Sequence, residues 1–168
     1  MHAPCRPVET FDDELAELVA DMVATMYAAD GVGLAANQIG VDLKVFVFDC
    51  PDDDGAQHRG VVCNPVLTVP VGNERVLDES DEGCLSLPGG FMPCPRPDYA
   101  AVSGVDHTGA PVSYAGRGYL ARCLQHETDH TAGVVFGDRL ADRARKKLYK
   151  EAEKAAADFP PGWPAISR

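Results

Sequence analysis

The chain has 168 residues, 45% of them hydrophobic, and its 15 Lys and Arg against 26 Asp and Glu give a formal net charge of −11. This length favours one globular domain over residues 1–168, with a core that needs no disulfide framework. The acidic balance disfavours a general nucleic-acid binder, and the longest stretch without a charged residue, 60–73, is too short for a membrane span of ~20 apolar residues.

The N-terminal residues and the cysteines both bear on the cellular compartment. Pro4, Pro7 and acidic residues stand where a secretory signal would have a basic start and an apolar run. We therefore expect a cytoplasmic protein with reduced cysteines. No two cysteines form a CxxC pair, so most are predicted to be small buried core residues, among Cys5, Cys50, Cys63, Cys84, Cys94 and Cys123.

The first predicted element is an amphipathic helix. Thr10 followed by Asp13 resembles a capping box, which predicts that the helix begins there. Apolar residues then recur at helical spacing until Asp30-Gly31, at positions 15, 18, 19, 22 and 26. This pattern indicates that one helix face, including two methionines, packs against the core.

The middle of the chain alternates short strand-forming stretches with turn residues. A glycine-rich apolar run, GVGLAANQIG at 31–40, indicates little by itself. A polar loop is predicted at 51–60, and a turn at 107–109 is expected to join two strands as a hairpin. Stretches rich in β-branched and aromatic residues predict strands at 44–49, 61–63, 66–69, 99–105 and 111–114.

Two helices are predicted in the last part of the chain. Apolar residues recur at helical spacing from 118 to about 131, and Gly133 provides a stop. A final helix is expected from about 138 to 157, ended by Pro160-Pro161. Residues 138–150 hold six basic and two acidic side chains, which gives 6 − 2 = +4. The predicted fold class is α+β, with short, mostly antiparallel strands around a buried central helix and a C-terminal helix.

The predicted central helix contains the pattern HExxH. His126 and His130 are four residues apart, so on a helix they lie ~40° apart around the axis and ~6 Å apart along it, and both can bind one metal ion. Glu127 lies beside them, where a carboxylate serves as a general base rather than as a ligand. The apolar neighbours Leu120 and Leu124 disfavour the alternative of two histidines on a charged surface. The remaining histidines lack such spacing and are expected to be exposed, namely His2, His58 and His107.

A hydrolytic metal site needs a third protein ligand, and the sequence offers several. The metzincin pattern would require a histidine at position 136, which is Phe136. A glutamate from the last helix, Glu151 or Glu153, lies in a highly charged stretch and is a weak candidate. Cys84 has a thiolate that binds metals strongly, but spacing alone does not favour it over Cys123.

Three separate motifs together resemble the signature segments of the peptide deformylase family. They are GVGLAANQIG at 31–40, EGCLS at 82–86 and QHETDH at 125–130, in the family's order, within a similarity that extends from about Val8 to Leu140. The resemblance implies removal of the N-formyl group from the formyl-methionine of newly made polypeptides. It also implies one divalent ion per chain, Fe(II) with Zn or Ni as substitutes, held by Cys84, His126 and His130.

The resemblance further implies roles for the residues around this metal. The side-chain amide of Gln38 and the backbone N–H of Leu85 would stabilise the oxyanion that forms when water attacks the formyl carbon. Glu127 would accept the proton of this water and pass it to the departing amine. The nascent formyl-methionyl peptide would pair in an extended conformation with the backbone at Val32, Gly33 and Gly83. As in related bacterial enzymes, the basic residues within 139–150 are expected to contact the ribosome, whereas a solvated face is the competing interpretation.

The chain departs from the family pattern at two points. Thr131 stands where the family most often has Leu, and the segment before the first helix looks shortened. Arg122, one turn before His126, is expected either to border the substrate pocket or to be solvated at its rim. Two other function classes stay open at this stage: a catalytically inactive homologue or zinc-binding interaction domain, and a zinc endopeptidase, which Phe136 disfavours.

Overall fold

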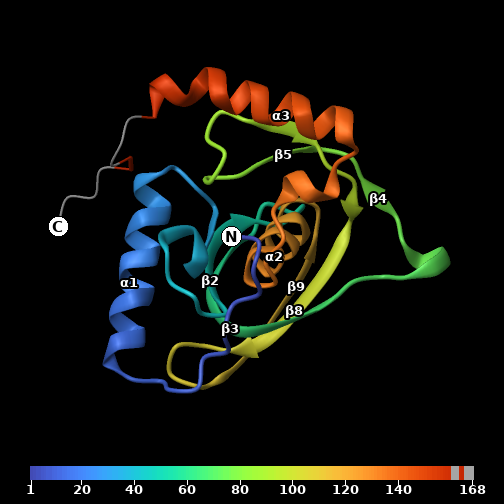
Figure 1. Ribbon diagram of the computed structural model, residues 1–168. Helices are drawn as coiled ribbons and strands as arrows, with labels where there is room; N and C mark the ends of the chain where they lie inside the picture. Colours follow the sequence, from blue (N-terminus) through green and yellow to red (C-terminus); the bar gives the residue numbers. More distant parts are fainter. Residues whose placement is uncertain (160–162, 165–168) are drawn as a thin grey trace.

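A five-stranded antiparallel sheet and the helix packed against it organise the fold (Figure 1). The computed structural model describes residues 1–159 and 163–164. The sheet has the order β1-β2-β3-β8-β9, with β1 (Gly33–Ala35), β2 (Val45–Pro51), β3 (Gln57–Thr68), β8 (Tyr99–Val105) and β9 (Pro111–Arg117). Strand β1 lies at one edge, so its outer side is open to pairing with another extended chain.

Strand β3 is longer than the sequence indicated. The predicted strands at 61–63 and 66–69 belong to one element, because an irregularity between Cys63 and Val66 lets the chain resume its pairing with β8. The predicted polar loop at 51–60 is shorter, since residues 57–60 already pair with β2. The hairpin of β8 and β9 is confirmed, and its second strand continues to Arg117.

Helix α1 (Asp13–Ala28) has the predicted buried face but a different cap. Asp12 caps the helix by accepting the N–H of Leu15, so the prediction that Thr10 begins it was wrong by two residues. The helix ends shortly before Asp30, where φ is positive at 54°. Its apolar residues pack with the side chains of β1 and β2 in one core cluster, through Leu15, Val19, Met22 and Met26.

Helix α2 (Gly118–Thr131) is the predicted central helix, and its bounds are confirmed (Figure 1). Gly118 at its start and Gly133 just after it have positive φ values of 56° and 79°, which glycine adopts without strain. Leu120 and Leu124 are fully buried against the aromatic side chains of β2. Because the sheet strands contact α2 along its length, most of its polar side chains are buried too.

Two small two-stranded sheets are formed by the chain between the two long strands β3 and β8. Strand β4 (Leu77–Asp78) pairs with β7 (Arg96–Pro97), and β5 (Asp81–Gly83) pairs with β6 (Phe91–Pro93). Strand β7 contacts α2, whereas β6 contacts α3. Short 3-10 segments complete the structure as η1 (Ala36–Ile39), η2 (Gly72–Glu74), η3 (Phe136–Arg139) and η4 (Ala156–Asp158).

Helix α3 (Asp142–Ala155) is the predicted C-terminal helix, but it begins later than the sequence indicated. Residues 136–139 form η3 instead, where the Asp138 carboxylate accepts the N–H of Val135. Leu148 is completely buried against the hairpin of β5 and β6. The predicted stop at Pro160-Pro161 lies outside the described residues. Together the elements confirm the α+β class, with short strands around a central helix and a C-terminal helix.

Buried and exposed positions agree with the sequence analysis except at two histidines. All six cysteines are free and buried. His2 is exposed as expected, whereas His58 and His107 are half-buried; the His58 ring bonds the Asp52 carboxylate at 2.7 Å. Across residues 1–159 and 163–164, none of the helices combines the length and apolar character that a bilayer span requires.

Candidate active site

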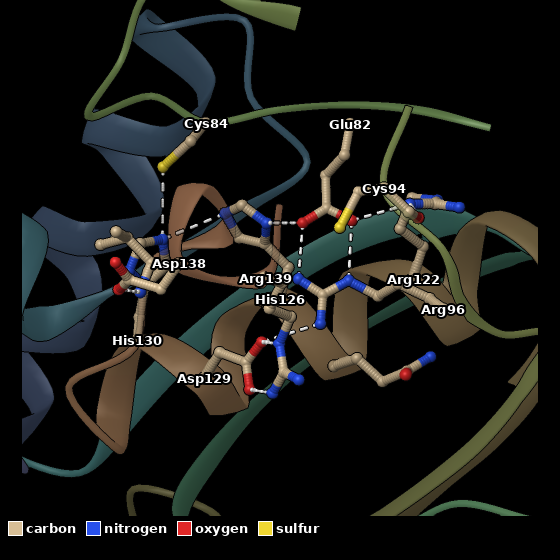
Figure 2. A network of polar contacts seen from close by, with 12 residues as sticks. Glu82, Cys84, Cys94, Arg96, Arg122, His126, Asp129, His130, Asp138 and Arg139 are labelled. Atoms are coloured by element: carbon tan, nitrogen blue, oxygen red, sulfur yellow. Dashed lines mark hydrogen bonds and ion pairs between the residues drawn. The ribbon is translucent and has the colours of Figure 1, made fainter. Parts of the chain in front are cut away.

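The sulfur of Cys84 and ring nitrogens of His126 and His130 converge beside α2 (Figure 2). Their ligand atoms all lie within 4.8 Å of one another, and all three residues are buried. Cys84 Sγ is 3.3 Å from His130 Nε2, which is 3.0 Å from His126 Nε2. The structure therefore brings together the three residues that the family resemblance implied as ligands.

The local structure explains why Cys84 joins the histidines. Cys84 directly follows β5, and its carbonyl accepts the N–H of Leu87 in a tight turn. Cys123, which spacing alone favoured equally, lies on α2 with its Sγ 3.6 Å from the carbonyl oxygen of Val32. Helical spacing aligns the two histidines, whereas the fold of the β5–β6 hairpin places Cys84, and not Cys123, beside them.

The other candidates for the third ligand lie elsewhere. The Phe136 ring packs 6.0 Å from the His126 ring, where it contributes apolar surface rather than a ligand. Glu151 on α3 forms an ion pair with Lys154, and Glu153 is exposed. These positions argue against the zinc endopeptidase interpretation.

Glu82, to which the sequence analysis assigned no role, orients His126. Its Oε1 lies 2.7 Å from His126 Nδ1. An ionised carboxylate only accepts hydrogen bonds, so Nδ1 carries the proton and Nε2 presents its lone pair to the ligand cluster. Burial alone would raise the pKa of Glu82, but hydrogen bonds from Arg96 and His126 outweigh it and hold the pKa well below its usual range. Glu82 therefore stays ionised.

Glu82 also belongs to a buried chain of ion pairs (Figure 2). Arg96 donates to Glu82 at 2.6 and 2.7 Å and to Asp129 at 2.7 Å. Asp129, on α2, accepts in addition from Arg139 of η3. The chain of charges ties β5, β7, α2 and η3 together around His126.

Arg122 belongs to the same network of ion pairs. Its contacts decide whether it borders the substrate pocket or is solvated at the rim, the two alternatives that the sequence left open. Its Nη1 donates to Glu82 at 2.8 Å and to the Cys94 carbonyl at 2.7 Å, and its Nη2 donates to the Asp78 carboxylate at 2.9 Å. Arg122 is buried and lines the same cavity as Cys84 and His126. It therefore borders the pocket with its donors already engaged, and the solvated alternative was wrong.

We expect Glu82→Gln to destabilise the protein and weaken the metal site. Two buried guanidinium groups lose a charged partner, and breaking such a pair costs about 3–5 kcal/mol of unfolding free energy. Metal affinity should fall roughly 10- to 100-fold, because the uncharged amide is a weaker acceptor for the His126 Nδ1–H than the carboxylate that fixes the orientation of the ring. Denaturant unfolding and metal competition measure the two effects.

The control for this variant is Asp42→Asn, which removes an exposed ion pair with Arg6. Exposed pairs contribute little, so unfolding free energy and metal affinity should both stay nearly unchanged. Equal losses in the two variants would contradict the role assigned to Glu82.

Glu127 is buried beside the ligands, and one of its oxygens is unpaired. Among the described residues its Oε2 has no hydrogen-bond partner, and burial raises the pKa of Glu127 to about 7. The carboxylate packs over Gly33, where an added Cβ would come closer than 3.0 Å to Oε1. A buried carboxylate oxygen without a partner costs free energy, so its presence in a residue that lines the same cavity as Cys84 and His126 indicates a functional group.

Gln38 and Leu85 line the cavity next to the ligand cluster. Gln38 Oε1 accepts the N–H of Ala35 at 2.8 Å, which fixes the side chain of this residue in η1. Its Nε2 lies 3.6 Å from Cys84 Sγ and 3.1 Å from Ser86 Oγ. Both residues that the resemblance implied as oxyanion donors are therefore close to the cluster.

A cavity of about 550 Å³ opens beside these groups, and Val32, Gly33 and Gly83 line it. The Val32 carbonyl already accepts the N–H of Asp49 at 2.9 Å within the sheet. Because bonding groups alternate sides along an antiparallel strand, those of Gly33 face the open edge of β1. An extended chain can therefore pair at Gly33.

Hydrogen bonds hold both Thr131 and the N-terminal segment in place. Thr131 is buried, and its hydroxyl donates to the Thr128 carbonyl at 2.8 Å. The Thr131 carbonyl accepts the N–H of Cys5 at 3.0 Å, and Arg6 bridges to Leu43 just before β2. The N-terminal segment is therefore tied to the end of α2 and to the sheet.

The donor set fits a transition-metal ion. A thiolate and two imidazoles bind divalent iron, nickel and zinc, and three protein ligands leave one position open, which distinguishes catalytic from structural sites. Glu82 fixes His126 so that its Nε2 lone pair faces the other ligand atoms, and Glu127, whose Oε2 has no hydrogen-bond partner among the described residues, lines the same cavity as Cys84 and His126. Fold and site together define a metal-dependent hydrolase of the HExxH type.

Comparisons with known proteins identify the family. A family model described as polypeptide deformylase matches residues 1–146, and the chain belongs to this family. Peptide deformylase 1 of Streptomyces avermitilis is 53% identical over 167 residues, which cover 99% of this chain and 76% of that protein. Members of the family are metal-dependent enzymes that deformylate nascent peptides.

Solved deformylase structures share the fold. The crystal structure of a peptide deformylase from Legionella pneumophila matches with a TM-score of 0.80 and 39% identity, covering 95% of this chain and 92% of that one. The deformylase from Synechococcus elongatus, solved in complex with actinonin, matches with a TM-score of 0.79 and 38% identity, covering 92% and 82%.

Proposed function

We propose that this chain removes the formyl group from the N-terminal formyl-methionine of nascent polypeptides, in the cytoplasm and as a single domain over residues 1–168. The observation that carries the proposal is the convergence of Cys84, His126 and His130, together with Glu127, which lines the same cavity and whose Oε2 has no hydrogen-bond partner among the described residues. Membership of the deformylase family supports the same reaction.

Cys84, His126 and His130 would hold one divalent ion, Fe(II) first, with Zn or Ni as substitutes. The thiolate and the two imidazoles support this choice, and so does Glu82, which fixes one imidazole. A divalent ion supplies Lewis acidity, which lowers the pKa of water.

The protein's own groups carry out the remaining steps. Glu127 accepts the proton of the attacking water and passes it to the departing amine. The side-chain amide of Gln38 and the backbone N–H of Leu85 donate hydrogen bonds to the oxyanion that develops on the formyl oxygen. The support for these roles is the position of all three residues along the cavity that contains the ligand cluster.

The substrate backbone pairs with Gly33 and Gly83, and Val32 completes that part of the cavity wall. The methionine side chain enters the cavity. Arg122 borders it, but bonds to Glu82 and Asp78 engage its guanidinium, so the arginine offers the cavity its side-chain surface rather than a free charge.

The test is substrate choice. We expect formyl-Met-Ala to be preferred over acetyl-Met-Ala by at least roughly 10²-fold in kcat/KM, because the extra methyl must fit where Gly33 and the Cys84 segment crowd the carbonyl carbon. The same assay includes an internally cleavable peptide. Equal rates on the first two peptides, or cleavage of the third, would contradict the proposal.

We also propose that α3 brings the enzyme to the ribosome. Exposed basic side chains at i, i+3, i+4 and i+7 share one face of this helix, and they are Arg143, Lys146, Lys147 and Lys150. Arg139 and Arg145 differ from them, because each pairs with an aspartate. Ribosomal RNA supplies the phosphate groups that such a basic face attracts.

Replacing these four basic residues by Glu should abolish co-sedimentation with ribosomes at low salt. Turnover of formyl-Met-Ala serves as the folding check. The matched control makes the same charge change on other elements, at the exposed residues Arg6, Arg59, Arg75 and Arg117. Binding that survives the change on α3, or that is lost equally in the control, would reject ribosome docking through this helix.

A further inference from the structure

The cavity beside the ligand cluster has one wall that no signature motif supplies. Phe159, which follows η4, and Trp163 line it together with Cys84, His126 and Glu127. Both aromatic residues lie beyond residues 1–146, the part of the chain that the family model matches. The cavity therefore extends from the reacting groups to the C-terminal segment.

Helix α3 brings Phe159 to the cavity by packing on the loop between β5 and β6. An added Cβ at Gly89 would come closer than 3.0 Å to Ala155 Cβ and to 3.4 Å from Phe159 Cε2. The Phe159 and Trp163 rings are 4.8 Å apart at 73°, an edge-to-face pair. The glycine in the loop thus allows close contact, and the two rings support each other.

Other residues add apolar surface to the same cavity. Phe91 of β6 is 62% exposed, and its ring lies over Gly83, where an added Cβ would come closer than 3.0 Å. Residues 28–30 at the end of α1 also line the cavity, and Figure 1 shows the described end of the chain near that end of α1. The cavity therefore connects the backbone proposed to pair with substrate to the rings of Phe91, Phe159 and Trp163.

An extended peptide directs successive side chains to opposite sides. With the methionine side chain in the cavity, the side chain of the second residue points away, and that of the third points to the same side, ~7 Å further along. We propose that Phe159 and Trp163 form an aromatic subsite for the third residue of the nascent chain. This inference rests on the proposed deformylase function.

The chemistry of the subsite favours large apolar side chains over acidic ones. Burial against two aromatic rings stabilises a leucine or phenylalanine side chain, whereas serine has little apolar surface to bury. Asp30 and Asp81 also line the cavity and are exposed, so an acidic third residue meets like charges.

The kinetic test uses the metal-loaded enzyme and amidated peptides. Wild-type kcat/KM should be about 3- to 10-fold higher for formyl-Met-Ala-Leu than for formyl-Met-Ala-Ser, mainly through KM. Phe159→Ala and Trp163→Ala should each bring this ratio close to 1, while Phe159→Leu keeps part of it. Tyr149→Ala is the matched control, because this exposed aromatic residue of α3 does not line the cavity.

A binding test needs no turnover. Trp163 is the only tryptophan of the chain, so its fluorescence reports directly on this wall. Titration with the product peptide Met-Ala-Leu should change the emission, and Met-Leu-Ala, which moves the large side chain to the second position, should change it much less.

The outcomes separate the two proposals. If wild-type enzyme releases no formate from formyl-Met-Ala, the proposed function fails, and the fluorescence titration still decides the subsite. If formate is released but the ratio of kcat/KM for formyl-Met-Ala-Leu to kcat/KM for formyl-Met-Ala-Ser is the same in wild type and both alanine variants, the proposed subsite is refuted. A preference that follows the second residue instead of the third, or an equal emission change with both product peptides, would also overturn it.

Discussion

Glu127→Gln should keep the metal and lose the reaction, with kcat lower by on the order of 10²-fold or more. The amide has the size of the carboxylate, so it fills the same space over Gly33. It cannot accept a proton, however, and proton transfer from water to the departing amine then lacks its carrier. Metal analysis measures the bound metal per chain, and steady-state kinetics with formyl-Met-Ala measures kcat.

The control for Glu127→Gln is Glu151→Gln, a half-exposed glutamate on α3 that pairs with Lys154 away from the ligand cluster. This variant should retain wild-type metal content and kcat. Near-normal turnover by Glu127→Gln would remove Glu127 from the mechanism, and loss of metal together with activity would mean that the carboxylate acts on the metal site instead.

Cys84→Ala should lose both metal and activity. The change removes the thiolate and leaves two histidines, whose affinity for a divalent ion is much weaker. Metal content per chain after dialysis measures the first effect, and formate release measures the second. Retention of full metal and activity would refute the ligand assignment.

Other cysteines provide the comparison for Cys84→Ala. Cys5, Cys50 and Cys94 are also buried and free, but the ligand cluster does not include them. Their alanine variants should keep stoichiometric metal, even where a smaller core side chain lowers stability. A similar loss of metal in these variants would indicate general unfolding rather than loss of a ligand.

The central helix and its two histidines could be predicted because the information is local. Helical spacing of apolar residues and a glycine stop set the bounds of α2, and HExxH sets the angle between His126 and His130. The hairpin of β8 and β9 was predictable for the same reason. The cap at Asp12 was missed because Thr10 gives a similar local signal, and only the folded chain shows which side chain bonds the helix.

The rest of the site depends on contacts between distant segments. No spacing rule distinguishes Cys84 from Cys123. The family resemblance implied Cys84, and the structure places it beside the two histidines. Glu82 and Arg96 lie 14 positions apart on strands of different two-stranded sheets, so no periodic pattern pairs them. Phe159 reaches the cavity only because α3 packs on Gly89. Contacts between such distant segments cannot be predicted from the periodicity or spacing of residues.

The most direct test of the central claim is a titration of metal-free protein with Fe(II) under anaerobic conditions, monitored by formate release from formyl-Met-Ala. We expect activity to rise linearly with bound metal and to reach its maximum at one ion per chain. Formate release by the metal-free protein at the same rate, or no release at one bound ion per chain, would contradict it.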